Sequence, residues 1–197
     1  MHSVINPKVT AEAATLHYIL ETKGSTFTVR AFAAGLLSAL GHDPVIAIPE
    51  FEGEIFLNTE AVEKSSLRLL IPSSSLSVIG DISEKDRDEI NRRMHGEVLQ
   101  SDSYSEIIYD CNRLSASKTG EGQYWAALNG DLELCGIKRN QGVSARITVN
   151  GTTLRAMGDF SIRQSDFDIR PVTALGGAVK LKDELKFSFD ITARKQD

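Results

Sequence analysis

The chain has 197 residues, 41% of them hydrophobic and 25% charged, with a formal net charge of −5 at pH 7, so it can form one domain with its own hydrophobic core. This mildly acidic balance argues against a nucleic-acid binder, which needs a basic surface for the phosphates. The sequence has no apolar run near the roughly 20 residues of a membrane span, no Cys/His spacing typical of zinc and no signal-peptide pattern, so we expect a cytoplasmic protein without an integral membrane segment, metal or cofactor.

The N-terminal part of the chain is predicted to hold a leader, a strand and a short helix. Residues 1–15 are predicted to be the leader, and residues 16–197 a single barrel domain. In residues 25–33, apolar and polar side chains alternate, which is typical of a strand with one buried face. Residues 34–40 favour a short helix that ends before Gly41. The apolar face of the strand holds Phe27, Val29, Ala31 and Ala33.

Two further strands precede the one long helix of the prediction. Residues 51–57 and 67–71 show the same alternation of apolar and polar side chains. Ser83 is a residue type that caps helix N-termini, and Asp86 follows it three residues later, as in a capping box. Apolar residues then recur at a spacing of four, so we expect an α-helix at about residues 83–95.

From Tyr104 onward the alternation is strongest, and about six strands follow one another. Turn sequences such as Asn150-Gly151 separate them, and no helical pattern lies between them, which argues against parallel βαβ units. Each strand has one apolar and one polar face, as antiparallel strands do when one face is buried. About eight such strands can hide their apolar faces by closing into a barrel. We therefore expect an all-β fold with a single antiparallel β-barrel.

The inner face of this barrel is predicted to hold small residues beside large ones. Alanine and glycine at inward positions leave volume that is costly to keep empty, at about 24 cal/mol per Å3. A ligand could fill that volume, or Phe and Leu from opposite walls could pack into it, and composition leaves both readings open. The lumen residues that we predict to bind a ligand are Phe27, Val29, Ala31, Phe51, Ile55, Leu69, Tyr124, Ala126, Leu128, Ala145, Ile147, Ala156, Phe160, Phe187 and Phe189.

Several short blocks occur in an order that resembles a known family. They are STFTVR at 25–30, FEG at 51–53, the helix at 87–94, SDSYSEI at 101–107, GDLELCGI at 130–137 and IRQSDFDI at 162–169. Over residues 16–194 their order is similar to that of the YceI-like, lipocalin-like polyisoprenoid-binding family. The sequence departs from the family at Ser105, where a proline is common, and at Leu40-Gly41-His42-Asp43, which resembles a variant found in one branch.

This resemblance implies an elongated lipocalin-like barrel that holds a long isoprenoid or similar lipid tail in its lumen. It also suggests a homodimer. Many members of the family carry secretion signals, a pattern that this sequence lacks. The resemblance further implies that Arg163 lies near the cavity rim, where a guanidinium could contact an anionic headgroup such as a phosphate.

The sequence His42-Asp43-Pro44 is the most site-like cluster of polar residues. A histidine beside an aspartate could act as a general base or bind a polar headgroup at the barrel mouth. The same residues also fit a simple turn, in which Pro44 holds Asp43 extended. We predict His42, Asp43 and Arg163 as rim or headgroup residues, and we predict no catalytic and no metal-binding residue.

The function predicted from these patterns is non-catalytic binding, transport or storage of a long apolar ligand, such as a polyisoprenoid, a quinone or a related lipid. Two alternatives stay open. One is an enzyme that acts on a hydrophobic substrate with His42. The other is a ligand-free stress-response or interaction module with a packed core, which a lumen filled by Phe27, Leu128, Phe160 and Phe187 would favour.

Overall fold

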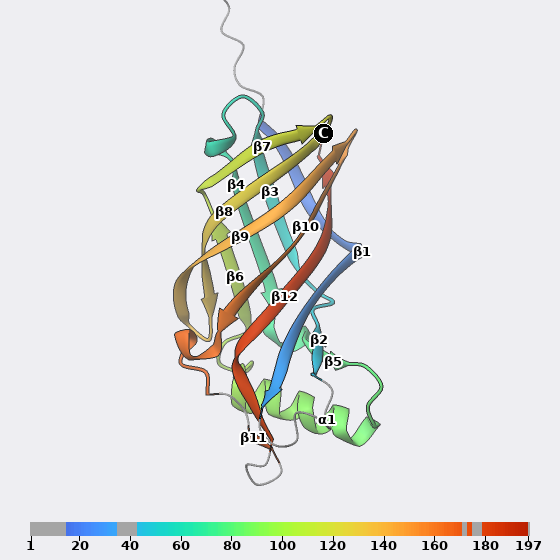
Figure 1. The fold of residues 1–197 in the computed structure, drawn as a ribbon, viewed down its shortest axis with the longest axis vertical. Coiled ribbons are helices and arrows are strands. Elements are labelled where there is room, and N and C mark those ends of the chain that lie inside the picture. Colours follow the sequence, from blue (N-terminus) through green and yellow to red (C-terminus); the bar gives the residue numbers. More distant parts are fainter. Residues whose placement is uncertain (1–14, 35–42, 171–172, 175–178, 197) are drawn as a thin grey trace, which may run out of the picture.

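The computed structural model describes residues 15–34, 43–170, 173–174 and 179–196. One long antiparallel sheet makes up most of this part of the chain, together with one α-helix and several short helical turns (Figure 1). The strands are β1 (Thr15–Ala34), β2 (Val45–Ala47), β3 (Glu52–Asn58), β4 (Ser66–Pro72), β5 (Ser77–Ile79), β6 (Glu106–Cys111), β7 (Leu114–Gly120), β8 (Gln123–Leu134), β9 (Ile137–Asn150), β10 (Thr153–Arg163), β11 (Thr173–Ala174) and β12 (Val179–Lys195). The helical elements are η1 (Val62–Lys64), η2 (Ser73–Ser75), α1 (Glu84–Arg93), η3 (Met94–Val98) and η4 (Gln164–Phe167).

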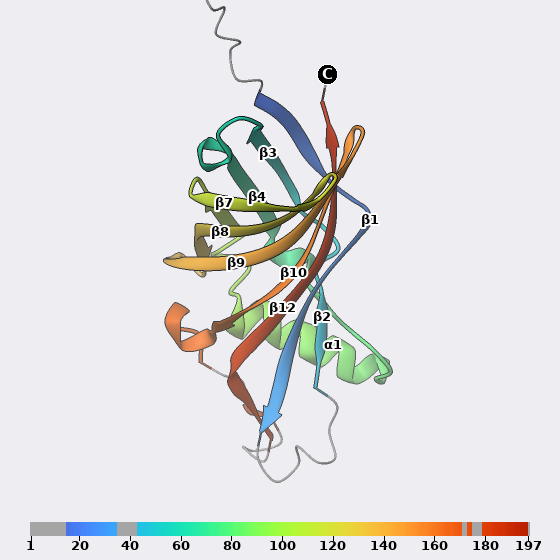
Figure 2. The same ribbon diagram turned by 45° about the horizontal axis from the view of Figure 1, so that its top comes forward.

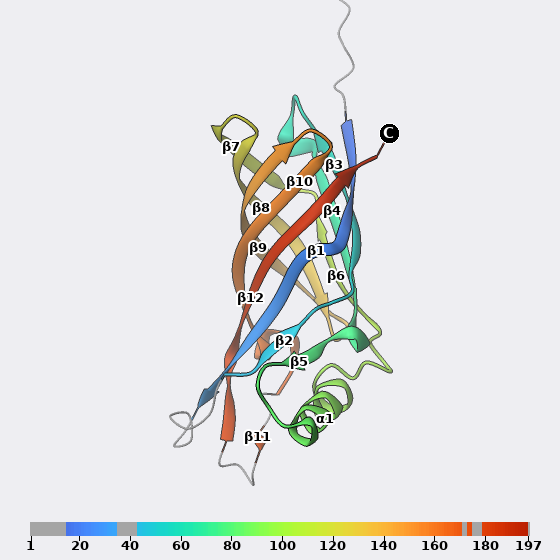
Figure 3. The same ribbon diagram turned by 90° about the vertical axis from the view of Figure 1, so that its right-hand side faces the viewer.

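The sheet closes on itself into an eight-stranded antiparallel barrel, as the sequence predicts. Each strand pairs with the next around the ring, and β12 pairs with β1 along most of its length to complete it (Figures 1 and 3). The order around the ring is β1, β12, β10, β9, β8, β6, β4 and β3. Closure satisfies the backbone N–H and C=O groups that would otherwise form an open edge.

Short strands extend the wall where the long ones diverge. Strand β6 pairs with β8 near Asp131, whereas β7 pairs with the other part of β8, around Ala126. Strand β2 pairs with β1 around Val29 (Figure 2), and β5 pairs with β2 (Figure 3). The barrel wall therefore stays continuous although β1 and β8 each change partners along their length.

The first strand begins earlier than predicted, and its inward face changes phase. Tyr18 and Leu20 face the interior before Gly24, whereas Phe27 and Val29 face it afterwards. Gly24 has a φ of +81°, and the register of β1 against β12 shifts over the same stretch. A β-bulge with a glycine in the left-handed region produces such a change of phase. Because the alternation of apolar and polar residues reverses near Gly24, the sequence predicts only the part of β1 that follows this glycine.

The predicted helix at 83–95 is confirmed as α1, which lies at one end of the barrel beside β5 (Figure 1). The Ser83 hydroxyl accepts a hydrogen bond from the backbone N–H of Asp86 at 3.1 Å and so caps the N-terminus. Beyond Arg93 the chain continues as one π-helical turn to Val98, and Met94 in this turn is buried.

Two other predictions fall almost entirely outside the described residues. Of the predicted leader at 1–15, only Thr15 is described, and it is the first residue of β1. Of the predicted short helix at 34–40, only Ala34 is described, and it pairs as the last residue of β1. The ladder of β1 with its neighbouring strands includes these two residues, and the rest of both predictions lies outside the described residues.

Candidate functional site: an apolar cavity inside the barrel

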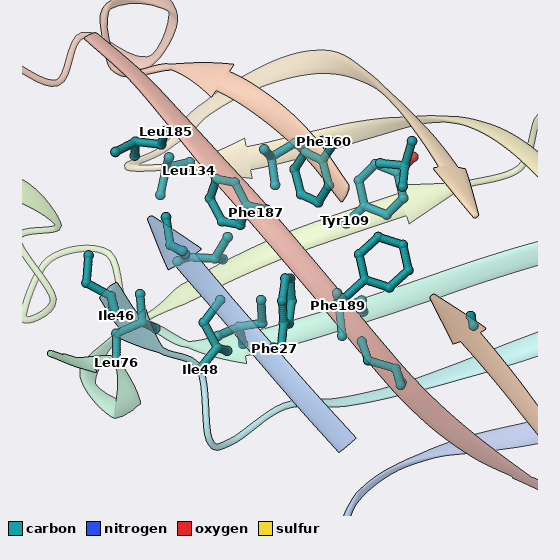
Figure 4. A pocket seen from close by; sticks show the side chains of 18 of the residues that line it. Phe27, Ile46, Ile48, Leu76, Tyr109, Leu134, Phe160, Leu185, Phe187 and Phe189 are labelled. Carbon is teal, nitrogen blue, oxygen red and sulfur yellow. The ribbon is translucent and has the colours of Figure 1, made fainter. Parts of the chain in front are cut away.

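The inward side chains of the barrel enclose a cavity of about 1380 Å3. Typical pockets for small organic ligands measure roughly 300–1,000 Å3, so this cavity suits a larger occupant. Its wall is mostly leucine, isoleucine, valine, alanine and phenylalanine. Figure 4 shows side chains from opposite walls pointing into this common space. The chemistry of the wall favours a hydrocarbon chain over a polar solute.

All of the predicted lumen residues except Phe51 line this cavity. Phe51 is buried, with 7% of its surface exposed, and its ring packs edge-to-face against Phe27 at 6.3 Å between centroids. Phe51 lies just before β3, outside the regular alternation, and packs within the core, so its contact with a ligand stays a prediction.

Four phenylalanine rings pack together on the cavity wall. Phe160 and Phe187 stack face to face with centroids 4.7 Å apart, and Phe27 lies 6.3 Å from both Phe187 and Phe189 (Figure 4). These rings pack against one another along the wall. The cavity persists beside them, so the reading of a lumen filled by these side chains is wrong.

Small residues on the inner face leave space for the phenylalanine rings. Ala126 on β8 pairs with Ala145 on β9, and Ala145 in turn pairs with Gly158 on β10. A Cβ atom at Gly158 would lie 2.8 Å from the ring of Phe189 and 2.3 Å from the carbonyl oxygen of Ser144. The absence of a side chain at Gly158 therefore lets Phe189 lie flat on the wall instead of projecting into the lumen.

Two buried tyrosines on the wall differ in their hydrogen bonding. The Tyr109 hydroxyl donates to the backbone carbonyl of Gln141 at 3.0 Å, and burial raises the pKa of this phenol. Tyr18 is 1% exposed and packs against Leu154 and Ala193, and burial raises its pKa too. Its hydroxyl has no hydrogen-bond partner among the described residues, while no fully buried side-chain oxygen there lacks one, so this hydroxyl reaches the cavity.

Of the predicted rim residues, one lies at the cavity. Asp43 lines it, and its Oδ1 accepts a hydrogen bond from the backbone N–H of Ala33 at 3.0 Å, so this carboxylate helps to hold the end of β1. His42 lies outside the described residues. Arg163 is exposed and is not among the residues that line the cavity, because alternation along β10 turns it outward, towards Asp183. Arg163 therefore does not line the lumen, and its contact with a headgroup stays a prediction.

Charged side chains gather where the cavity meets α1. Asp81, Asp86 and Glu89 join Asp43 on the wall, and Arg93 is the one cation that lines the cavity within the described part of the chain. Arg93 pairs with Glu97 at 3.1 Å. A hydrogen bond from Arg92 holds the pKa of Glu89 below its ordinary value. Among the described residues that line this end of the cavity, carboxylates therefore outnumber cations.

The sequence prediction missed several wall residues. Leu16, Tyr18 and Leu20 belong to the part of β1 whose alternation is hidden by the change of phase. Gln164 also lines the cavity, with 2% of its surface exposed. Continuing the inward series of Phe160 and Ile162 by two residues would have found it.

Other kinds of site receive little support from the described residues. No group of three or more His, Cys, Asp or Glu side chains there is placed to hold a metal ion. Within the same residues, no helix is long and apolar enough to span a membrane. Cys111 is buried and Cys135 half-buried, and both are free thiols. His17 pairs with Glu54 at 3.0 Å and stacks on the exposed Phe56, and it does not line the cavity.

Comparison with known proteins gives one family and several similar folds. A family model described as YceI-like domain matches residues 18–193. The structure is similar to BcnA from Burkholderia cenocepacia, with a TM-score of 0.68 and 16% identity over 88% of this chain and 98% of that one. No curated protein sequence matches the chain.

Two more solved structures share the fold at low identity. One is a polyisoprenoid-binding domain from Saccharophagus degradans implicated in plant cell wall breakdown, with a TM-score of 0.66 and 12% identity over 92% of this chain and 99% of that one. The other is a YceI protein from Campylobacter jejuni, with a TM-score of 0.57 and 12% identity over 77% of this chain and 85% of that one.

Proposed function

Because the chain belongs to the YceI-like domain family, we propose that it binds a long apolar ligand inside its barrel and does not catalyse a reaction on it. The ligand class that we favour is a polyisoprenoid, a quinone with an isoprenoid tail or a related lipid. The observation that carries the proposal is the apolar cavity of about 1380 Å3 that runs between the barrel walls.

The free energy available from such a cavity is large enough for binding. A tail that buries about 500 Å2 of apolar surface gains on the order of 12 kcal/mol, at about 25 cal/mol per Å2. Loss of translational freedom and ordering of the tail offset several kcal/mol of this gain. The remainder, about 8 kcal/mol or less, corresponds to dissociation constants on the order of micromolar or weaker.

One structural neighbour supports the proposed ligand class. The Saccharophagus degradans domain is described as polyisoprenoid-binding, and its fold aligns with nearly all of this chain. A shared barrel fold does not by itself imply a shared ligand, because functions differ among proteins with one fold. The apolar wall of this chain adds an independent physical argument for the same kind of ligand.

The polar groups of the wall support a binding role over a catalytic one. A general base must lie within hydrogen-bond reach of the proton that it removes. No histidine, lysine or free thiol lines the cavity among the described residues. The hydroxyl of Tyr109 and the carboxylate of Asp43 are both engaged with backbone groups. Transport, a homodimer and a cytoplasmic location stay predictions.

Native mass spectrometry of the purified protein, followed by extraction into an apolar solvent, tests the proposal. We expect one bound apolar species, or, for a protein isolated empty, uptake of geranylgeraniol at one molecule per chain. A protein that carries no such species and takes up no prenyl or alkyl chain at micromolar concentration would contradict the proposal.

A further inference from the structure

Gln164 is a polar residue in an otherwise apolar part of the cavity wall. It is the first residue of η4, directly after β10, and only 2% of its surface is exposed. The inward residues of β10 that precede it are Ile162, which is buried in the core, and Phe160, which lines the cavity. Burial of an amide costs free energy unless its hydrogen bonds are formed, so the partners of this side chain show what it can do.

The amide nitrogen of Gln164 has its partners within the protein. Nε2 donates to the backbone carbonyl of Lys182 at 2.9 Å and to that of Asp183 at 3.4 Å. Carbonyl oxygens only accept hydrogen bonds, so the NH2 group must face them. This fixes the orientation of the amide and turns Oε1 away from β12.

The amide oxygen is left for another partner. No described residue donates a hydrogen bond to Oε1 of Gln164. No fully buried side-chain oxygen in the described residues lacks a partner, so this oxygen is in contact with the open cavity. It is therefore an acceptor that points into the space where a ligand would lie.

The surrounding contacts hold Gln164 in place. The backbone N–H and the hydroxyl of Ser165 both donate to the carboxylate of Asp183, at 2.8 and 2.6 Å. The backbone N–H of Ile169 donates to the Gln164 carbonyl at 3.1 Å. A group that is already fixed loses little conformational entropy when it binds a ligand.

The chemistry of this acceptor indicates which headgroups fit. The hydrogen bonds of the Gln164 amide are to backbone carbonyls of β12, so Oε1 is its one group left for a ligand. An amide oxygen offers no donor to a phosphate or a carboxylate, whereas it accepts a hydrogen bond from a hydroxyl or an N–H group.

We propose that Gln164 determines headgroup specificity, with its Oε1 accepting a hydrogen bond from a neutral hydroxyl or N–H group of the bound ligand. The inference rests on the proposed function and narrows it to tailed ligands with an uncharged donor. Tyr18 also presents a hydroxyl to the cavity, but a hydroxyl both donates and accepts and so does not select one chemistry.

The test compares ligands that differ only in the headgroup. Geranylgeraniol, its methyl ether and its monophosphate share one tail, and titration calorimetry on the full chain gives their dissociation constants. We expect the alcohol to bind about 5-fold more tightly than the ether, the usual scale of one hydrogen bond, and more tightly than the phosphate. Equal affinities for alcohol and ether, or tighter binding of the phosphate, would overturn the inference.

Two variants connect the preference to the residue. Gln164→Leu should bind the alcohol and the ether equally well, because it keeps the volume of the side chain and removes the acceptor. Gln123→Leu is the matched control, since Gln123 is exposed on β8, and it should keep the wild-type preference. A Gln164→Leu protein that still prefers the alcohol would also overturn the inference.

The ligand comparison separates this inference from the proposed function. It uses the wild-type protein, so it holds even if Gln164→Leu fails to fold. Binding of neither the alcohol nor the ether would contradict the proposed function itself. Equal binding of both would leave the proposed function standing and remove only the role of Gln164.

Discussion

The inner and outer faces of the same strands differ in what their side chains contact. Ala126 and Ala127 are neighbours on β8, yet Ala126 is 1% exposed and lines the cavity, whereas Ala127 is exposed on the outer surface. The inner face surrounds space that side chains do not fill, and the outer face carries charged pairs. One strand therefore lines the cavity with one face and carries exposed side chains on the other.

The outer face contributes little through its charges. Arg155 pairs with Asp190 across β10 and β12, and Lys186 pairs with Asp159 at 3.4 Å. Both pairs are well exposed, and exposed ion pairs each contribute only about 0–1 kcal/mol. The closed hydrogen-bonded ring and the packed aromatic wall must therefore supply most of the stability.

The largest expected effect comes from filling the lumen. Ala126→Trp should lower the affinity for geranylgeraniol about 100-fold or more, because the indole would occupy the space of the tail. The cavity beside Ala126 gives the ring room, so we expect the barrel to stay folded. Isothermal titration calorimetry measures the affinity, and circular dichroism checks the fold.

Ala127→Trp is the control for this variant, because it adds the same ring one residue along the same strand. It should bind the ligand like the wild type. If the two tryptophan variants lose affinity equally, binding does not take place on the inner face.

A smaller effect is expected from adding one methyl group to the inner face. Gly158→Ala should lower the free energy of unfolding by about 2 kcal/mol, within the range found for overpacked cores. The new Cβ would meet the Ser144 carbonyl and the Phe189 ring. Urea denaturation measures the change.

Gly142→Ala is the matched control on the outer face. A Cβ there would have the Leu128 carbonyl oxygen as its nearest neighbour, at 4.0 Å, which is an ordinary contact. This variant should be as stable as the wild type or slightly more stable, because alanine restricts the unfolded chain. Equal destabilisation by both substitutions would contradict the tight packing of Phe189 on Gly158.

The two buried tyrosines allow a sharper comparison within the inner face. Tyr109→Phe should lower the free energy of unfolding by about 1 kcal/mol, because the Gln141 carbonyl loses its donor. Tyr18→Phe should change it by less than about 0.5 kcal/mol, because the Tyr18 hydroxyl has no partner among the described residues. A larger loss for Tyr18→Phe than for Tyr109→Phe in urea denaturation would contradict this assignment.

The smallest effect is expected at the outer ion pair and depends on pH. The hydrogen bond from Arg155 holds the pKa of Asp190 below its ordinary value of 3.8. The pair therefore stabilises the fold above that pH, and its contribution is lost as the pH falls through the lowered pKa. Asp190→Asn should slightly reduce stability at pH 7, and this loss should shrink as the pH falls below 3.8. Urea denaturation at pH 7 and at a series of lower values tests this, and a loss that stays the same at every pH would exclude the ionic cause.

Most of the fold could be predicted because the alternation of apolar and polar residues along a strand shows which of its faces is buried. The run from Tyr124 to Leu134 keeps one phase throughout, and its predicted lumen residues Tyr124, Ala126 and Leu128 all line the cavity. The first strand could be predicted only from residue 25 onward, since the bulge at Gly24 reverses the phase. Strict alternation of apolar and polar residues does not identify a strand whose inward phase reverses partway along it.

The candidate site was predictable where it is apolar and less so where it is polar. Asp43 was predicted as a headgroup residue and is found capping a backbone N–H beside the cavity. Arg163 was placed at the rim by resemblance, although alternation along β10 turns it outward. Gln164 was missed because a polar residue on an apolar face breaks the pattern that identifies the face. Only the positions of the Lys182 and Asp183 carbonyls show how its amide is held.

The central claim, that the lumen holds an apolar tail, is tested most directly by the dependence of affinity on tail length. Titration of the wild-type protein with unbranched alcohols of increasing length should give a dissociation constant that falls by about 2- to 4-fold per methylene until the lumen is full, since a buried CH2 contributes about 0.8 kcal/mol before ordering costs. In the Ala126→Trp variant, the dissociation constant should stop falling at a shorter tail. An affinity that does not depend on tail length, or the same dependence in both proteins, would contradict the account.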